Sequence, residues 1–227
     1  MEIKSTNTVS IKRATILITG VSGSGKTFLA RSLPEKEVLI ISLESGLMSL
    51  MGTNISVIEV KNKKELDEVM KFLGSSENKF KYIFFDSLSE LGELLLFELK
   101  QDPKFQDPRN TLQLYGKYNE QITSYIKYVR DLPQNVILTC LEANTTDGLE
   151  KVVTFHLPGS AIKNSLKSFI DICLHLKIFE GDDKKKVRKL VTSSEESVIS
   201  KDRSGKLRAY EDVDLHNLFN KILGEKS

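Results

Sequence analysis

One eight-residue segment near the N-terminus restricts the folds open to this chain more than any other feature. Residues 20–27 read GVSGSGKT, which fits the pattern G-x-x-x-x-G-K-[ST]. The apolar residues before it, 14–19, predict a buried strand, and residues 28–33 predict the first turns of a helix. A strand, a glycine-rich loop and a helix in this order direct backbone N–H groups and a helix N-terminus at a phosphate. The alternative is a glycine-rich turn with a structural role only.

The pattern predicts a nucleotide site that also takes Mg²⁺. Lys26 is expected to contact the β- and γ-phosphates, and the Thr27 hydroxyl is expected to hold the metal. The predicted nucleotide-binding residues are consecutive in the chain: Gly20, Val21, Ser22, Gly23, Ser24, Gly25, Lys26, Thr27 and Phe28.

Two acidic residues each follow a predicted strand. Asp86 comes directly after the apolar residues 82–85, and Glu44 comes just past residues 38–42. In an open α/β sheet, the carboxyl ends of neighbouring strands converge on the ligand. We expect Asp86 to hold Mg²⁺, directly or through water, and Glu44 to orient and deprotonate the attacking water. The alternative for Asp86 is that Asp86 or Ser87 only caps the following helix, and the alternative for Glu44 is an ordinary loop glutamate.

Strands and helices are expected to alternate along the chain, which predicts an α/β fold with a mainly parallel sheet covered by helices on both faces. A late antiparallel hairpin is expected from residues 174–179 and 187–192, with a turn at 181–183. Residues 101–110 and 142–160 are polar and are expected to be loops, apart from a short alternating segment at 152–155. The expected strands are residues 14–19, 38–42, 55–60, 82–85 and 136–141, and the expected helices are 64–73, 88–99, 112–132, 161–169 and 214–223.

Length and composition narrow the class of protein. With 227 residues the chain fits one domain, residues 13–227, preceded by a tail or docking arm at residues 1–12. The formal net charge of +2 means that any affinity for nucleic acid must come from local patches. Cys140 and Cys173 lie in apolar runs and are expected to be buried thiols in a reducing, cytoplasmic compartment. No apolar run reaches the length that spans a membrane, so no membrane partner is expected.

Two charged segments lie late in the chain, and a structural interpretation is open for each. Residues 201–205 (KDRSG) are either a solvated turn or a pair of cations, Lys201 and Arg203, delivered to the γ-phosphate of a neighbouring subunit. Residues 184–189 form the densest basic cluster, and a charged hairpin tip kept for solubility is the simpler interpretation. The three histidines, His156, His175 and His216, have no metal-ligand spacing.

With these residues in hand, the chain resembles the RecA-type ATPases, and most of all the phage Sak-type single-strand annealing ATPases. The resemblance implies a RecA-like P-loop NTPase core and ATP as the nucleotide. It also implies that ATP sits between subunits of a homo-oligomer, ring or filament, with Glu44 as the catalytic glutamate and Lys201 and Arg203 supplied by the next protomer. The matching blocks are residues 20–27, 43–47, 85–91, 114–117, 130–133 and 201–205.

The resemblance also implies where single-stranded DNA binds. Two loops that line the filament axis correspond to residues 101–110 and 143–160, which offer Lys104, Arg109, Lys151 and Phe155 as DNA-binding residues, with His156 beside them. Relatives place a polar sensor at the end of the core strand. Here Leu141 stands near that position with Glu142 beside it, so either Glu142 acts as the sensor or the coupling between ATP and DNA is weaker.

The function expected from these features is a DNA-stimulated ATPase, a hydrolase that promotes single-strand annealing in phage recombination. Single-stranded DNA, further copies of the chain and a single-strand DNA-binding protein are the expected partners, in the host cytoplasm if the gene belongs to a phage. The alternatives are an ATP-switched binding module with little hydrolysis and a small-molecule phosphotransferase. The latter needs an arginine-rich lid, whereas the middle of the chain offers only Arg109 and Arg130.

Overall fold

The computed structural model describes residues 12–44, 46–147, 150–180, 185–192 and 200–224. The expected tail or arm at residues 1–12 and the turn at 181–183 therefore fall almost entirely outside the described residues. None of the helices in the described part of the chain is both long and apolar enough to cross a membrane.

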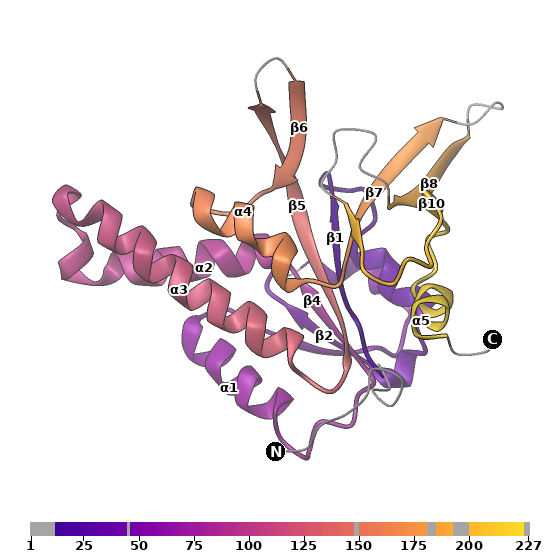
Figure 1. Cartoon of the computed structure of the whole chain (residues 1–227). Helices are drawn as coiled ribbons and strands as arrows, with labels where there is room; N and C mark the ends of the chain where they lie inside the picture. The colour runs from indigo at the N-terminus through magenta and orange to yellow at the C-terminus, as the bar shows by residue number, and fades with distance from the viewer. Residues whose placement is uncertain (1–11, 45, 148–149, 181–184, 193–199, 225–227) are drawn as a thin grey trace, which may run out of the picture.

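Within these ranges, ten strands pair into one sheet in the order β10-β8-β7-β1-β5-β4-β2-β3, with β6 added to β5 and β9 to β7 (Figure 1). The six strands from β7 to β3 in this order run parallel, whereas β6, β8, β9 and β10 pair antiparallel. The strands are β1 (Thr15–Gly20), β2 (Val38–Ser42), β3 (Ser56–Glu59), β4 (Tyr82–Asp86), β5 (Asn135–Asp147), β6 (Glu150–Phe155), β7 (Ile172–Glu180), β8 (Lys186–Val191), β9 (Lys201–Asp202) and β10 (Tyr210–Glu211).

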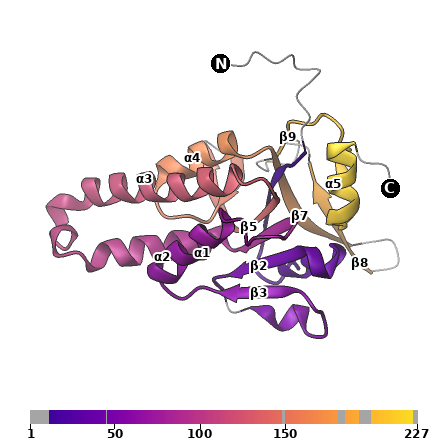
Figure 2. The same ribbon diagram turned by 90° about the horizontal axis from the view of Figure 1, so that it is seen from below.

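Alternating side chains of the central strands divide the core into two layers. On β1, Leu17 packs into the layer under four α-helices, whereas Ile16 and Ile18 pack into the layer on the opposite face. Figure 2 shows α1 to α4 gathered on one side of the molecule and α5 on the other. The helices are α1 (Lys63–Leu73), α2 (Leu88–Gln101), α3 (Thr111–Arg130), α4 (Ser160–Phe169) and α5 (Leu215–Leu223).

The predicted α/β fold class is confirmed: the core is a mainly parallel sheet that is covered on both faces. The late antiparallel hairpin is confirmed as β7 and β8. The closing helix is capped by Asp214, whose side chain accepts a hydrogen bond from the Asn217 amide. Both cysteines are free thiols and buried, as expected.

One local prediction is wrong about the type of helix. The segment after the glycine-rich loop is a 3-10 helix, η2 (Thr27–Ser32), rather than the start of an α-helix. Its short length follows from Pro34, which favours extended backbone at Leu33, where φ is −101° and ψ is 156°. The remaining 3-10 turns are η3 (Glu35–Glu37), η4 (Leu47–Leu50), η5 (Pro103–Phe105) and η6 (Pro108–Asn110).

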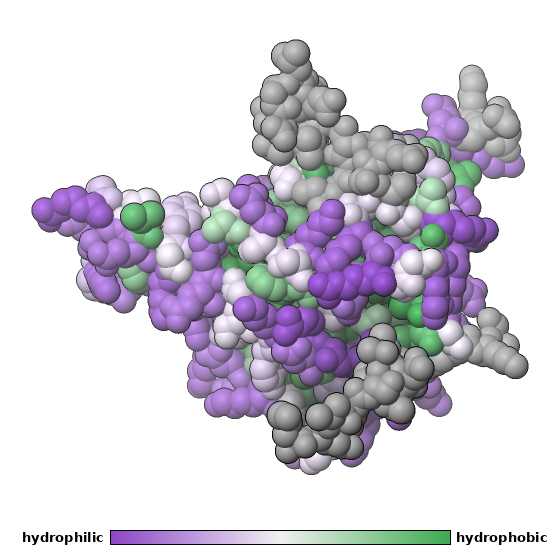
Figure 3. Space-filling model, viewed as in Figure 1, coloured by the Kyte–Doolittle hydropathy of each residue, from purple (hydrophilic) through white to green (hydrophobic). Residues whose placement is uncertain are grey.

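The larger correction concerns residues 142–160, which were expected to be mainly loop. Strand β5 continues past the core to Asp147 and pairs with β6, so most of this segment is a two-stranded hairpin. Its threonines and valines favour extended backbone, and cross-strand pairing satisfies the backbone groups despite the polar composition. The hairpin projects beyond the sheet (Figure 1). The face of the molecule that is turned to the viewer in Figure 3 is mostly hydrophilic, with scattered apolar patches.

Candidate nucleotide-binding site

The glycine-rich loop follows β1, whose neighbours are β5 on one side and β7 on the other. Gly23 and Gly25 have φ values of +75° and +104°, a region that side chains disfavour, so these two positions need glycine. The Lys26 amino group donates hydrogen bonds to two loop carbonyls, Gly20 O at 3.0 Å and Val21 O at 2.9 Å. The loop therefore closes around a lysine that is only 7% exposed.

Asp86 and Thr27 come together as the sequence predicts. The Thr27 hydroxyl donates to Asp86 Oδ2 at 2.6 Å, and the Thr139 hydroxyl donates to Asp86 Oδ1 at 2.5 Å. Helix α2 is capped by Ser87, whose hydroxyl accepts from the Glu90 amide at 3.4 Å. The alternative role of Asp86 as the cap is thus excluded, and its carboxylate faces the loop.

These oxygen atoms fit Mg²⁺. Magnesium takes oxygen ligands and is usually held by one or two carboxylates together with substrate phosphates. Thr27 and Asp86 supply a hydroxyl and a carboxylate, and Ser42, which pairs with Asp86 across β2 and β4, adds a buried hydroxyl. That hydroxyl has no hydrogen-bond partner among the described residues. No group of three or more His, Cys, Asp or Glu side chains in the same residues forms a competing metal site.

Glu44 lies at the same end of the sheet, past β2. Its Oε1 accepts a hydrogen bond from the Ser87 hydroxyl, which ties this exposed carboxylate to the start of α2. Burial lowers the pKa of the Lys26 amino group, and the carboxylates of Glu44 and Asp86 oppose that shift. The structure thus gathers Lys26, Thr27, Asp86 and Glu44, all four predicted from sequence, at one site.

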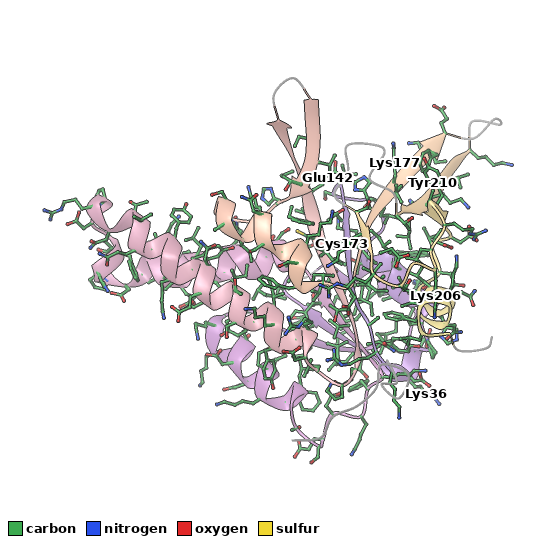
Figure 4. The ribbon with its side chains drawn as sticks, in the orientation of Figure 1. Lys36, Glu142, Cys173, Lys177, Lys206 and Tyr210 are labelled. Carbon is green, nitrogen blue, oxygen red and sulfur yellow. The ribbon has the colours of Figure 1, made fainter. Side chains whose placement is uncertain are left out.

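Glu142 reaches this site from β5 but is paired. Its Oε2 lies 3.5 Å from His175 Nε2, and both side chains are largely buried. Leu141 pairs with Gly20 across β5 and β1, so the end of the core strand lies beside the glycine-rich loop, as the expected sensor position requires. Figure 4 labels Glu142 at the base of the projecting hairpin. No local sequence pattern indicates this pairing, because residues 142 and 175 belong to strands that are separated by β1 in the sheet.

Arg188 is the functional candidate that sequence reasoning missed. Its Nε donates to Ser24 O at 2.8 Å, and a Cβ added at Gly25 would meet Arg188 Nε at 3.4 Å. The guanidinium therefore lies directly against the glycine-rich loop rather than serving only solubility. A cavity of about 580 Å³ opens beside it, lined among others by Phe28, Arg31 and Val187. The only available signal was the density of positive charge in residues 184–189.

Lys201 and Arg203 lie away from the loop of their own protomer. Lys201 lies in β9, and Arg203 follows that strand directly. Strand β9 pairs with Ile172 and Cys173 at the start of β7, whereas the glycine-rich loop lies at the far end of the parallel strand β1. Lys201 Nζ donates to Lys167 O at 2.7 Å and Ile170 O at 2.6 Å, around the C-terminus of α4. Cations at this position are favoured by the helix dipole.

Arg203 also forms hydrogen bonds at the C-terminus of α4, but its side chain stays half exposed. It donates to Ser168 O at 2.9 Å and to Asp171 Oδ1 at 3.1 Å, and its side chain remains 51% exposed. The turn is therefore neither freely solvated nor within reach of its own nucleotide loop.

The predicted DNA-binding residues separate into two places. Lys104 and Arg109 lie at the tip joining α2 and α3, and Figure 1 shows that tip at a different end of the molecule from the β5–β6 hairpin, which carries Lys151. Arg109 is paired with Asp107 at 2.5 Å. Phe155 is 1% exposed and packs in the core, so its predicted stacking on bases is wrong. Successive side chains of a strand point to opposite faces, and Phe155 lies on the buried face of β6.

A family model described as an AAA domain, AAA_24, matches residues 12–204. No curated protein matches the chain. Among solved structures, a KaiC-like protein of the hyperthermophilic archaeon Pyrococcus horikoshii OT3 is 14% identical, with 78% of this chain and 77% of that chain covered and a TM-score of 0.40. The chain belongs to the AAA domain family AAA_24 and is a P-loop ATPase.

Proposed function

We propose that this ATPase binds single-stranded DNA and promotes its annealing in phage recombination, hydrolysing ATP at the interface between subunits. One observation carries the proposal: a single strand, β5, runs from the nucleotide site into the projecting hairpin. Its inner half bears Thr139, bonded to Asp86, and its outer half pairs with β6. A ligand on the hairpin and a phosphate at the loop would therefore act on the same strand.

The assignment of roles follows from where each residue lies. Lys26 binds phosphate, Thr27 and Asp86 hold Mg²⁺, and Glu44 activates the attacking water, all in one protomer. Lys201 and Arg203 lie at the opposite end of the sheet, so their action on phosphate requires a second copy of the chain in a ring or filament. Glu142 reports the state of the γ-phosphate to the hairpin.

Lys151 on β6 is the proposed DNA contact nearest to this path, and Lys104 and Arg109 form a second, separate contact region. Because the net charge is only +2, binding depends on these local cations and weakens as salt rises. A single-strand DNA-binding protein is a further proposed partner, and the cytoplasm of a phage host is the proposed location.

Annealing of two complementary, fluorescently labelled DNA strands tests the proposal. We expect the protein with ATP and Mg²⁺ to accelerate annealing, and Lys151→Ala to reduce both DNA affinity and annealing while ATP binding is retained. Lys36→Ala, at the opposite end of the sheet before β2, is the matched control (Figure 4). Annealing at the protein-free rate would contradict the proposed function.

A second candidate, an ATP-switched binding module with little hydrolysis, draws on the pairing of Glu142 with His175. A carboxylate already held by an imidazole is a less available sensor. ATP-dependent DNA binding with negligible turnover would favour this candidate. The phosphotransferase alternative has less support, because Arg109 and Arg130 are paired with their neighbours Asp107 and Asp131.

A further inference from the structure

Strand β1 ends at the nucleotide loop, and its two neighbours, β5 and β7, are joined beside the loop by a pair of side chains. Thr19 on β1 pairs with His175 on β7 and with Cys140 on β5. His175 and Glu142 therefore lie on either side of the last residues of β1 before the loop. The His175 Nε2 and Glu142 Oε2 atoms lie 3.5 Å apart. Their side chains are 8% and 15% exposed, so water competes little for this contact.

The hydrogen bonds around Thr19 favour one arrangement of protons on His175. The Thr19 hydroxyl has one hydrogen and donates it to Leu174 O at 3.2 Å. Its oxygen lies 3.2 Å from His175 Nδ1 and can accept a hydrogen from that nitrogen in the tautomer that carries one there. Nε2 faces a carboxylate that only accepts, so the contact with Glu142 is favourable when Nε2 also carries a hydrogen.

The charge on Glu142 matters because the site is already rich in carboxylates. Glu44, Asp86 and Glu142 all act electrostatically on Lys26, and each raises the pKa of its amino group against the effect of burial. Phosphates bound in the loop add further negative charge. An unpaired Glu142 would be repelled from them, whereas a Glu142 paired with a positive imidazole can stay beside them.

We infer that His175 is a positioning residue that holds the Glu142 carboxylate beside the nucleotide phosphates. The pair joins the two hairpins that flank the loop, because β7 leads to β8 with Arg188, and β5 leads to β6. This inference rests on the proposed function in one respect, the role of Glu142 as the reporter of the nucleotide.

Nitrogen-15 NMR of the histidine rings tests the pair directly, since the chain has three histidines. In the full-length protein at pH 7.5 we expect both ring nitrogens of His175 to carry hydrogen, and Glu142→Gln to convert the ring to the neutral form protonated at Nδ1. His216 on α5 is the internal reference and should not change. A His175 ring that is neutral in the wild type, or identical in the two proteins, would overturn the inference.

A double-mutant cycle on binding of the ATP analogue AMP-PNP tests the effect on the site. We expect His175→Ala to weaken binding by about threefold to thirtyfold when Glu142 is present, and by less than about twofold in the Glu142→Gln background. Equal losses in both backgrounds would overturn the inference, and thermal unfolding of each variant checks that it is folded. Neither measurement needs turnover or DNA, so a failure of the proposed annealing function would leave both results interpretable.

Discussion

The Thr27 hydroxyl donates a 2.6 Å hydrogen bond to Asp86 Oδ2, joining the nucleotide loop to the end of β4 across 59 residues of sequence. Strand β5 lies between β1 and β4, and its Thr139 holds the other carboxylate oxygen. Asp86 is therefore fixed in orientation before any metal arrives, which is the arrangement that a magnesium site needs.

Asp86→Asn should abolish most hydrolysis while nucleotide still binds. An amide is a poor replacement for a carboxylate ligand of Mg²⁺, and the metal contributes several kcal/mol to transition-state stabilisation, so we expect a loss of at least about 100-fold in kcat. Steady-state turnover at saturating Mg²⁺ measures it. Asp131→Asn, at the C-terminal end of α3, is the matched control and should keep normal turnover.

Arg203→Ala should leave ATP binding intact and lower turnover by about 10³- to 10⁵-fold, as expected for a cation supplied to the transferred phosphate. The structural cost should be small, since an exposed pair such as Arg203–Asp171 contributes about 0–1 kcal/mol. Mixing the Arg203→Ala protein with the Lys26→Ala protein should restore part of the activity. Some interfaces then combine an intact Lys26 from one protomer with an intact Arg203 from its neighbour. Normal turnover by Arg203→Ala alone would rule out the role in a neighbouring subunit.

Arg188→Ala should weaken nucleotide binding. Its hydrogen bond to Ser24 O holds the loop, and removing a hydrogen bond from a charged donor that is partly exposed should cost about 1 kcal/mol, or about fivefold in Kd. Fluorescence titration with a labelled ADP measures the change. Lys186→Ala on the same strand is the control, and an equal loss there would assign the effect to general charge.

Glu90→Gln should stabilise the protein at neutral pH. Burial, together with the charges of Glu44 and Glu93, raises the pKa of the Glu90 carboxyl above its ordinary value of 4.5. The folded state then binds this proton more tightly than the unfolded state, so stability is lost as pH rises through 4.5 and the higher folded-state pKa. We expect a higher Tm for Glu90→Gln at pH 7 and no such advantage at pH 4. An advantage of the same size at both pH values would mean that charge is not the cause.

Two glycines within helices form a matched pair for packing. An alanine Cβ at Gly92 in α2 would meet Tyr118 Oη at 2.8 Å and Pro158 Cδ at 3.0 Å, whereas Gly116 in α3 has open space around it. We expect Gly116→Ala to stabilise by about 0.5–1 kcal/mol through helix propensity, and Gly92→Ala to destabilise by about 1–3 kcal/mol through overpacking. Chemical denaturation measures both, and stabilisation by Gly92→Ala would show that the contact relaxes easily.

The local sequence was sufficient to predict those site residues whose chemistry and backbone position follow from the same short pattern. The spacing of glycines before Lys26 and the apolar run before Asp86 each predict a residue at the end of a parallel strand, and both lie at the site. Phe155 was misassigned because an alternating polar segment hides which face is buried. The contacts of Arg188 with Ser24 and of His175 with Glu142 depend on strand order across β1, which no local pattern specifies.

Steady-state ATP hydrolysis with and without single-stranded DNA tests the central claim most directly, with Lys26→Ala as the blank. Because β5 links the nucleotide site to the hairpin, the account predicts a clear rise in kcat when DNA is added, and none in the blank. Bound ATP with the same rate in the presence and absence of DNA would contradict it.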